Sequence, residues 1–319
     1  MPARIIVTRK LPEPVEARLR EHFTVALNHD DTPFGPGRLA SGFRAADGML
    51  CAVSDQITAS LLAAPDRRLA ILANFGVGVN NIDLEAARAA GVVVTNTPGV
   101  LTDATADLAM ALILAATRRM TESEALLRQG GWDGFRPTAM LGMGLQGKRL
   151  GIIGMGRIGQ ATARRAAAGF GMEIVYFNRS PVGPFDFPAE PRPSIEAVMA
   201  EADIVSLHIP GGGENRGRIG AEALAAMKPT AYLVNTARGD LIDEPALIAA
   251  LREGRIAGAG LDVFAEEPKV PAGLIALPNV TLLPHIGSAT LETRTAMGML
   301  AVDNLIAYFE GTPLPSQVL

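Results

Sequence analysis

The stretch that decides the fold is RLGIIGMGRIGQATAR, residues 149–164. An apolar strand-like run leads into three glycines spaced G-x-G-x-x-G, which open an amphipathic helical run. In this motif the glycines allow a tight turn, a close approach of the backbone to a pyrophosphate and close packing of helix on strand. The alternative is a glycine-rich turn of another α/β fold, but the preceding strand and following helix favour a dinucleotide. The predicted cofactor residues of this turn are Gly154, Met155, Gly156, Arg157, Ile158 and Gly159.

Strand-like and helical stretches alternate along nearly the whole chain, a rhythm that predicts parallel sheets covered by helices on both faces. Six strand candidates start at the glycine turn: KRLGIIG, EIVYF, DIVSLHI, AYLVNT, AGAGLDVF and NVTLLPH. Six parallel strands with helices between them match a full dinucleotide-binding domain. The first hundred residues hold fewer candidates, RIIVT, MLCAV, LAILANF and VVVTN, as expected of a smaller flavodoxin-like unit.

Two long helices set the expected domain boundaries. One runs from Thr102 to about Met120, and the other, from Thr290 to about Glu310, has no strand after it and is expected to return to the N-terminal unit. The predicted class is therefore α/β with two doubly wound parallel-sheet domains, a Rossmann cofactor domain inserted in a smaller substrate domain. The expected ranges are 100–285 for the Rossmann domain, and 1–99 with 286–319 for the substrate domain.

Composition excludes several classes of function. The 319 residues are 48% hydrophobic and 19% charged, with a net charge of −4, so nothing attracts nucleic acid or an anionic membrane. The single cysteine, Cys51, forms no internal disulfide, which fits a reducing compartment. The longest apolar stretch, near DLAMALILAATRR, is too short to span a bilayer. We expect a cytoplasmic protein without a metal site, because no His, Cys or carboxylate spacing suggests one.

The strand EIVYF ends at Asn178-Arg179-Ser180, where an NAD-specific site usually places an acidic residue for the ribose hydroxyls. A neutral amide, a guanidinium and a hydroxyl stand here instead, and a guanidinium suits phosphate oxygens. The turn therefore favours NADP (as NADPH), with NAD as the alternative cofactor. Another reading is that Arg179 only stacks on the adenine or caps the turn.

Three polar residues lie near the ends of predicted strands: Arg238 in VNTARGDLID, Glu267 in AEEP and His285 in LPHIGS. The carboxyl ends of strands form the ligand crevice of an open α/β sheet, so these side chains are expected to meet there. The alternative reading is a surface ion cluster with a structural histidine.

A second glycine pair lies in Phe75-Gly-Val-Gly-Val-Asn80 and lacks a third glycine. This pattern predicts either an anion-binding turn or a plain connection between two elements.

The segments GIIGMGRIG, VNTARGDLIDEPAL, GAGLDVFAEEP and LPHIGSAT resemble the signature blocks of the D-isomer-specific 2-hydroxyacid dehydrogenases. The resemblance covers essentially the whole chain and is nearest to the glyoxylate and hydroxypyruvate reductases. It implies that Arg238 clamps the substrate carboxylate and polarises the keto oxygen, while His285 donates a proton to that oxygen as hydride arrives. It further implies that Glu267 orients the imidazole and favours its protonated form.

The resemblance also implies the rest of the site. The backbone of Val77 and Gly78 would complete the carboxylate pocket, and Asp262 would hold the nicotinamide carboxamide. The helix that begins at Thr102 and the segment GGWDGF would form a homodimer interface; the alternative for this apolar helix is ordinary core packing. Further cofactor contacts are expected from Thr105, His208, Ile209, Pro210, Asn215, Thr236, Ala237 and Gly287.

These observations predict an NADPH-dependent reductase that converts a small 2-keto acid, glyoxylate or hydroxypyruvate, into the D-2-hydroxy acid. A nearer alternative is a reductase of a bulkier acid such as phenylpyruvate. An alternative from another class is a non-enzymatic nucleotide sensor, because the C-terminal-binding-protein corepressors resemble the same family.

Overall fold

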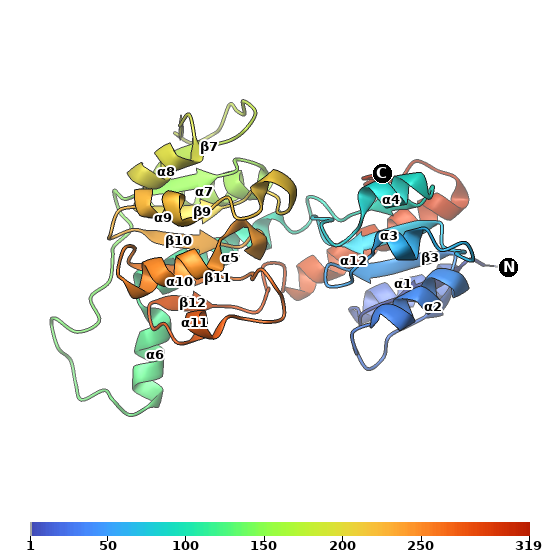
Figure 1. Cartoon of the computed structure of the whole chain (residues 1–319), viewed down its shortest axis with the longest axis horizontal. Coiled ribbons are helices and arrows are strands. Elements are labelled where there is room, and N and C mark those ends of the chain that lie inside the picture. Colours follow the sequence, from blue (N-terminus) through green and yellow to red (C-terminus); the bar gives the residue numbers. More distant parts are fainter. Residues whose placement is uncertain (1) are drawn as a thin grey trace. The chain divides into compact units, whose positions relative to one another are not determined.

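The computed structural model describes residues 2–319, and its internal contacts divide the chain into two compact units. The first unit comprises the chain up to Leu101 together with Ser288–Leu319, and the second comprises Thr102–Gly287. Each boundary lies two residues later than the sequence-based prediction. Figure 1 shows the chain leaving the first unit at about residue 100 and returning to it with the last helix. No helix in the described part of the chain is both long and apolar enough to cross a membrane.

The first unit is built on five parallel strands in the order β2-β1-β3-β4-β5. Strand β3 is buried on both faces: Met49 packs with Phe43 on one side, and Leu50 packs with Val15 on the other. Helices therefore cover both faces, as the apolar strands predict. The elements are β1 (Arg4–Val7), α1 (Glu13–His22), β2 (Thr24–Ala26), α2 (Pro36–Ala45), β3 (Gly48–Ala52), α3 (Ala59–Leu62), β4 (Ile71–Phe75), α4 (Leu84–Ala89), β5 (Val93–Thr95) and α12 (Leu291–Glu310).

The second unit holds seven parallel strands in the order β12-β11-β10-β9-β6-β7-β8. The chain adds β7 and β8 on one side of β6 and then places β9 on the other side of β6. The strand order therefore reverses between β6 and β9, and sheets of this kind bind ligands at such a reversal. Its elements are α5 (Thr102–Thr117), α6 (Met120–Arg128), β6 (Arg149–Ile153), α7 (Arg157–Phe170), β7 (Glu173–Phe177), β8 (Glu190–Pro191), α8 (Ile195–Glu201), β9 (Ile204–Leu207), η1 (Gly213–Asn215), α9 (Ala221–Ala226), β10 (Tyr232–Asn235), η2 (Gly239–Leu241), α10 (Glu244–Arg252), β11 (Gly258–Leu261), α11 (Ala272–Ile275) and β12 (Val280–Leu282).

The structure confirms the predicted α/β class with two parallel sheets, and it corrects the prediction in two places. Strands β2 and β8 were not predicted, because each is an edge strand of only three or two residues. The helix expected to reach about Met120 ends at Thr117. The next turn is broken because Arg119 has φ +52° and the returning chain donates a hydrogen bond from Met143 N to the Thr117 carbonyl (2.8 Å).

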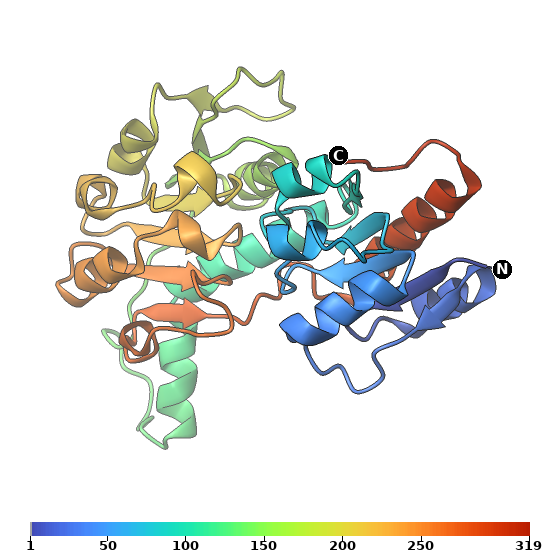
Figure 2. The same ribbon diagram turned by 45° about the vertical axis from the view of Figure 1, so that its right-hand side comes forward.

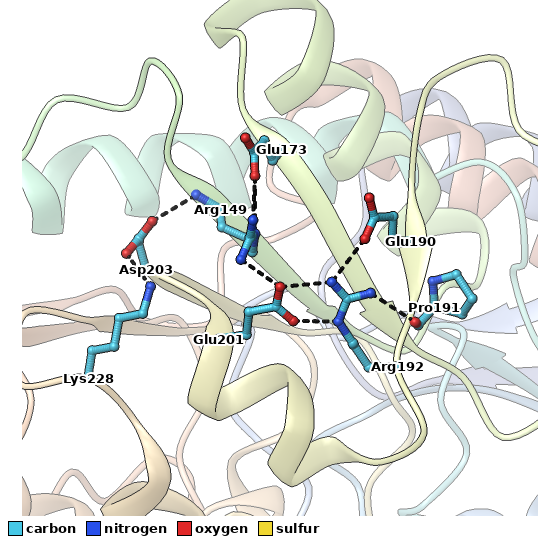
Figure 3. A network of polar contacts seen from close by, with 8 residues as sticks. All are labelled: Arg149, Glu173, Glu190, Pro191, Arg192, Glu201, Asp203 and Lys228. Atoms are coloured by element: carbon cyan, nitrogen blue, oxygen red, sulfur yellow. Dashed lines mark hydrogen bonds and ion pairs between the residues drawn. The ribbon is translucent and has the colours of Figure 1, made fainter.

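A network of ion pairs joins the amino ends of strands in the second unit (Figure 3). Glu201 accepts hydrogen bonds from both Arg149 (2.5 Å) and Arg192 (2.8 Å), and the hydrogen bond from Arg192 holds the pKa of Glu201 below its ordinary value. Asp203 accepts from Lys228 Nζ at 2.8 Å and from the Arg149 backbone at 2.9 Å. These charges stabilise the edge of the sheet opposite the strand ends that carry the predicted site.

Candidate functional site

The glycine-rich turn between β6 and α7 is shaped by three glycines with different neighbours. Gly154 has φ +98°, and a Cβ there would stand 2.7 Å from the His208 carbonyl oxygen. A Cβ on Gly159 would stand 2.1 Å from the Gly154 oxygen, so the packing of α7 on the turn requires this glycine. A Cβ on Gly156 would have no heavy atom within 4 Å. The protein itself therefore leaves space at Gly156, which a pyrophosphate lying against the turn would fill.

The amino end of α7 offers N–H groups to an anion. Gly156 is the N-cap residue, no side chain caps the helix, and its first turn holds no acidic residue. Asn178, just after β7, accepts a hydrogen bond from Met155 N (3.0 Å) and donates one to the Ser180 carbonyl (2.8 Å). The neutral amide thus ties the glycine turn to the turn after β7, and the residues present fit a dinucleotide.

Arg179, the predicted phosphate ligand, lies at the surface next to this turn. Its side chain is 85% exposed and donates from Nη1 to Glu214 Oε1 at 2.8 Å, and the Glu214 side chain is 75% exposed. Exposed ion pairs of this kind contribute little free energy. The guanidinium can therefore exchange Glu214 for a phosphate at small cost.

His285 and Glu267 form a direct pair, with His285 Nδ1 2.7 Å from Glu267 Oε2. The other oxygen of Glu267 accepts a hydrogen bond from Phe264 N at 3.0 Å, so the carboxylate is held from two sides. Burial pushes the pKa of Glu267 upward, but the hydrogen bond and charge of His285 outweigh it and leave this pKa below its ordinary value. Within the described part of the second unit, His285 Nε2 has no hydrogen-bond partner, so this nitrogen is available to a substrate.

The backbone that carries His285 is held by Asp262, which is fully buried after β11. The Asp262 carbonyl accepts from His285 N (2.8 Å), and its two carboxylate oxygens accept from Ile286 N (2.7 Å) and Gly287 N (2.8 Å). Burial raises the pKa of Asp262. His285 has φ +54°, an uncommon conformation for a residue with a side chain, and these three bonds maintain it.

Arg238 follows β10 in a turn fixed by its neighbour Asn235. The buried Asn235 amide donates to the Arg238 carbonyl at 2.8 Å and accepts from Ala237 N at 2.9 Å. The guanidinium donates from Nη1 to the Ala237 carbonyl (2.7 Å), which uses one of its five N–H groups. Burial lowers the pKa of Arg238, and the charges of Glu267 and Asp240 partly offset this. A half-buried cation with donors to spare is suited to bind a carboxylate.

The other predicted cofactor residues lie mostly at the carboxyl ends of neighbouring strands. His208 follows β9, with Nε2 2.9 Å from Ser206 Oγ; burial lowers the pKa of His208 to about 4, so the ring is neutral and is not suited to donate a proton at pH 7. Thr236 is buried, and its hydroxyl has no partner among residues 2–319. The remaining positions are Thr105, buried on α5 beside Gly287; Ile209, after β9; Pro210 and Asn215, joined by a 3.0 Å hydrogen bond; and Ala237.

Two residues that shape this region were missed from the sequence. Asn235 forms the turn under Arg238, as described above. Asp240 accepts hydrogen bonds from Gly212 N (2.8 Å) through its side chain and from Gly217 N (2.8 Å) through its carbonyl. It therefore organises the GGGENRG loop. The signal was an Asn or Asp in a turn, a residue type whose side chain hydrogen-bonds nearby backbone.

The structure thus brings His285 and Glu267 into contact, with Arg238 close enough for its charge to act on Glu267. Val77 and Gly78 belong to the first unit, in the turn after β4. There the Gly76 carbonyl accepts from Thr97 N (3.0 Å), the Val77 carbonyl from Asn96 Nδ2 (2.8 Å) and the Gly78 carbonyl from Asn74 Nδ2 (3.0 Å).

The chain is similar to known proteins over its whole length. The sequence model of the family "D-isomer specific 2-hydroxyacid dehydrogenase, NAD binding domain" matches residues 110–287. The chain is 46% identical to the glyoxylate reductase of Thermococcus litoralis, over 100% of this chain and 97% of that protein. It is also 46% identical to the glyoxylate reductase of Aeropyrum pernix, over 99% and 95%.

Solved structures of this family are also similar to the chain over its whole length. One neighbour is the NADPH-dependent glyoxylate/hydroxypyruvate reductase of Sinorhizobium meliloti, solved in complex with NADP and malonate. It has a TM-score of 0.87 and 38% sequence identity to this chain, and the match covers 100% of this chain and 97% of that one.

Proposed function

The chain belongs to the D-isomer-specific 2-hydroxyacid dehydrogenase family, and from this premise we propose that it reduces glyoxylate or hydroxypyruvate with NADPH. The observation that carries the proposal is the His285–Glu267 pair at 2.7 Å, with the half-buried Arg238 close enough for its charge to act on Glu267. The names of the relatives support small keto acids over bulkier ones such as phenylpyruvate.

In the proposed reaction the reduced nicotinamide, when bound, supplies hydride to the keto carbon. Arg238 binds the substrate carboxylate and places positive charge beside the keto oxygen, where negative charge develops. His285 Nε2 gives its proton to that oxygen, which completes the hydroxyl group. Glu267 keeps Nδ1 protonated and stabilises the charged imidazole before transfer. In the direction of oxidation the same nitrogen accepts the proton.

The preference for NADPH is supported by the turn after β7. Asn178 replaces the carboxylate that would bind both ribose hydroxyls and repel a 2′-phosphate. Arg179 supplies an exposed guanidinium held only by the surface pair with Glu214. The similar reductase of S. meliloti is NADPH-dependent and was solved with NADP.

The change Arg179→Ala is expected to raise KM for NADPH by about tenfold or more and to change KM for NADH by less than about twofold, because only NADPH carries the 2′-phosphate. Initial rates at varied cofactor concentration and saturating glyoxylate measure both constants. Glu214→Gln is the matched control, since it removes the competing carboxylate and should lower KM for NADPH. An equal effect of Arg179→Ala on both cofactors would contradict the assignment.

The change Glu267→Gln is expected to alter the pH profile of reduction. The pKa of Glu267 lies below its ordinary value, so in the wild type this carboxylate stays ionised through the neutral range and favours a protonated His285. A neutral amide removes that charge from beside the imidazole. The alkaline limb of kcat/KM for reduction should therefore shift to lower pH. An unshifted limb measured from pH 5 to 10 would contradict this role.

Turnover with four acids tests the proposed function directly. Glyoxylate, hydroxypyruvate, pyruvate and phenylpyruvate are each mixed with the protein and NADPH or NADH, and absorbance loss is followed. The proposal expects the highest kcat/KM for glyoxylate or hydroxypyruvate with NADPH. The highest value for phenylpyruvate would assign a bulkier substrate, and tight nucleotide binding without turnover of any acid would indicate a nucleotide sensor.

We propose further that the protein is a homodimer held by the arm formed by α6 and residues 129–143. Figures 1 and 2 show this arm extending from the sheet of the second unit, and no residue of α6 is buried. Among residues 2–319, five of the eleven exposed large hydrophobic residues lie on it, including Trp132 (64% exposed) and Phe135 (88%). Exposed apolar patches of this kind mark interfaces.

The dimer predicts a sedimentation mass of twice the 33.4 kDa chain at micromolar concentration. The double change Trp132→Glu with Phe135→Glu should convert it to monomer, because both charges would be buried at the interface. Ile275→Glu, on the exposed side of α11, is the matched control and should leave the dimer intact. A monomeric wild-type protein would contradict the proposal.

A further inference from the structure

The turn after β4 has an internal scaffold that the activity described above does not account for. Its three consecutive carbonyl groups, those of Gly76, Val77 and Gly78, all accept hydrogen bonds from residues outside the turn. Two of the three donors are asparagine side chains, Asn96 on the Val77 carbonyl and Asn74 on the Gly78 carbonyl. The turn is therefore held in place by one backbone N–H group and two asparagine side chains.

Fixing a carbonyl also fixes the next N–H group. In a trans peptide the C=O of one residue and the N–H of the following residue point in opposite directions. Asn96 thereby sets the direction of the Gly78 N–H, and Asn74 sets that of the Val79 N–H. Within the described part of the first unit, the N–H groups of Val77, Gly78 and Val79 have no acceptor. Successive N–H groups turned to one side form an anion-binding concavity.

Asn74 is anchored in the core of the first unit. It is fully buried, and its Oδ1 accepts from Asn81 Nδ2 at 3.2 Å. The same Asn81 nitrogen also donates to the carbonyls of Ala52 (3.2 Å) and Asp55 (3.1 Å), at the end of β3. The Asn74 amide therefore cannot rotate without breaking buried hydrogen bonds, which makes it a rigid donor to Gly78.

Asn96 is anchored through its backbone instead. Its N–H donates to the Ser316 carbonyl (3.2 Å), and its carbonyl accepts from Ser316 Oγ (2.6 Å). Its side chain, in contrast, makes the bond to Val77 O and is only partly buried. Removing the side chain therefore deletes the contact with the turn and leaves the anchoring bonds in place.

From these contacts we propose that Asn74 and Asn96 are positioning residues: they orient the Gly78 and Val79 N–H groups toward a substrate carboxylate. Neither side chain needs to touch the substrate; both act through the peptide groups of the turn. The proposal rests on the proposed function, since a keto acid supplies the carboxylate. It adds two residues, one on β4 and one directly after β5, that determine how well the acid binds.

The test compares Asn96→Ala and Asn74→Ala with wild type. We expect each change to raise KM for glyoxylate about tenfold, the equivalent of one hydrogen bond, with KM for NADPH changed by less than about twofold. The matched control is Asn28→Ala. Asn28 is an equally buried amide of the first unit that donates to the backbone carbonyls of Thr8 (2.7 Å) and Thr32 (2.8 Å), away from the turn. It should lose thermal stability and keep KM for glyoxylate.

Unchanged KM for glyoxylate in Asn96→Ala would overturn the proposal, as would an equal rise in Asn28→Ala. Asn96→Ala carries the test even if Asn74→Ala fails to fold. Oxalate separates this proposal from the proposed function, because it presents carboxylate without being reduced. Oxalate should raise Tm of the wild type and raise it less in Asn96→Ala, whether or not the protein turns over glyoxylate. An equal rise of Tm in both proteins would also overturn the proposal.

Discussion

Replacing His285 with asparagine is expected to lower kcat for glyoxylate reduction by about 10²–10⁴-fold, the usual contribution of a positioned general acid. Asparagine suits the test because it tolerates the left-handed backbone, φ +54°, found at this position. It is uncharged and has no proton to give, so the keto oxygen must take its proton from water.

Two measurements separate lost proton transfer from lost structure. Stopped-flow or steady-state rates at saturating glyoxylate and NADPH give kcat, and the fluorescence of bound NADPH gives its Kd. The Kd should stay within about twofold, because Asp262 holds the backbone of residues 285–287 and not the imidazole. A fall in kcat of less than about tenfold would remove His285 from the proton-transfer role.

Replacing Arg238 with glutamine is expected to lower kcat/KM for glyoxylate by about 10³-fold. The guanidinium is proposed to bind the carboxylate and to sit where charge develops on the keto oxygen, so its loss should affect both binding and rate. Arg238→Lys keeps the charge but not the planar fork, and its loss should be intermediate. The Asn235 bonds that shape this turn involve backbone atoms of residues 237 and 238, so the turn should survive both changes.

The control for Arg238 is Arg252→Gln. Arg252 is an exposed arginine in the last turn of α10, and its loss removes the same charge from the same unit. Initial rates at varied glyoxylate give kcat/KM for all three variants. A loss of less than about tenfold in Arg238→Gln, or an equal loss in Arg252→Gln, would contradict the assignment of Arg238 to the substrate.

Much of the fold could be predicted from the sequence, because a strand that is buried on both faces consists of a continuous apolar run that is visible without knowledge of its partners. RLGII, EIVYF and GMLCA read as strands without knowledge of their partners, and the glycine turn after RLGII predicted a nucleotide site. The edge strands β2 and β8 were missed, since they are only three and two residues long. The end of α5 was missed for another reason: it depends on Met143 returning to Thr117 from 26 residues away.

The candidate site could be predicted where a residue has a side chain that is reactive or charged. The positions of His285, Glu267 and Arg238 near strand ends predicted that they would meet, and the family resemblance implied their catalytic roles. Residues that act through the backbone give no comparable signal. The hydrogen bonds of Asn74 and Asn96 to the turn after β4 involve partners 4 and 19 residues away, and only the folded chain shows them.

The measurement that tests the central claim most directly is the stereochemistry of the product from hydroxypyruvate and NADPH. The protein is incubated with both until NADPH absorbance no longer falls, and the glycerate formed is separated on a chiral column. The proposed function predicts D-glycerate, formed in amounts equal to the NADPH consumed. L-glycerate, or consumption of NADPH without glycerate, would contradict it.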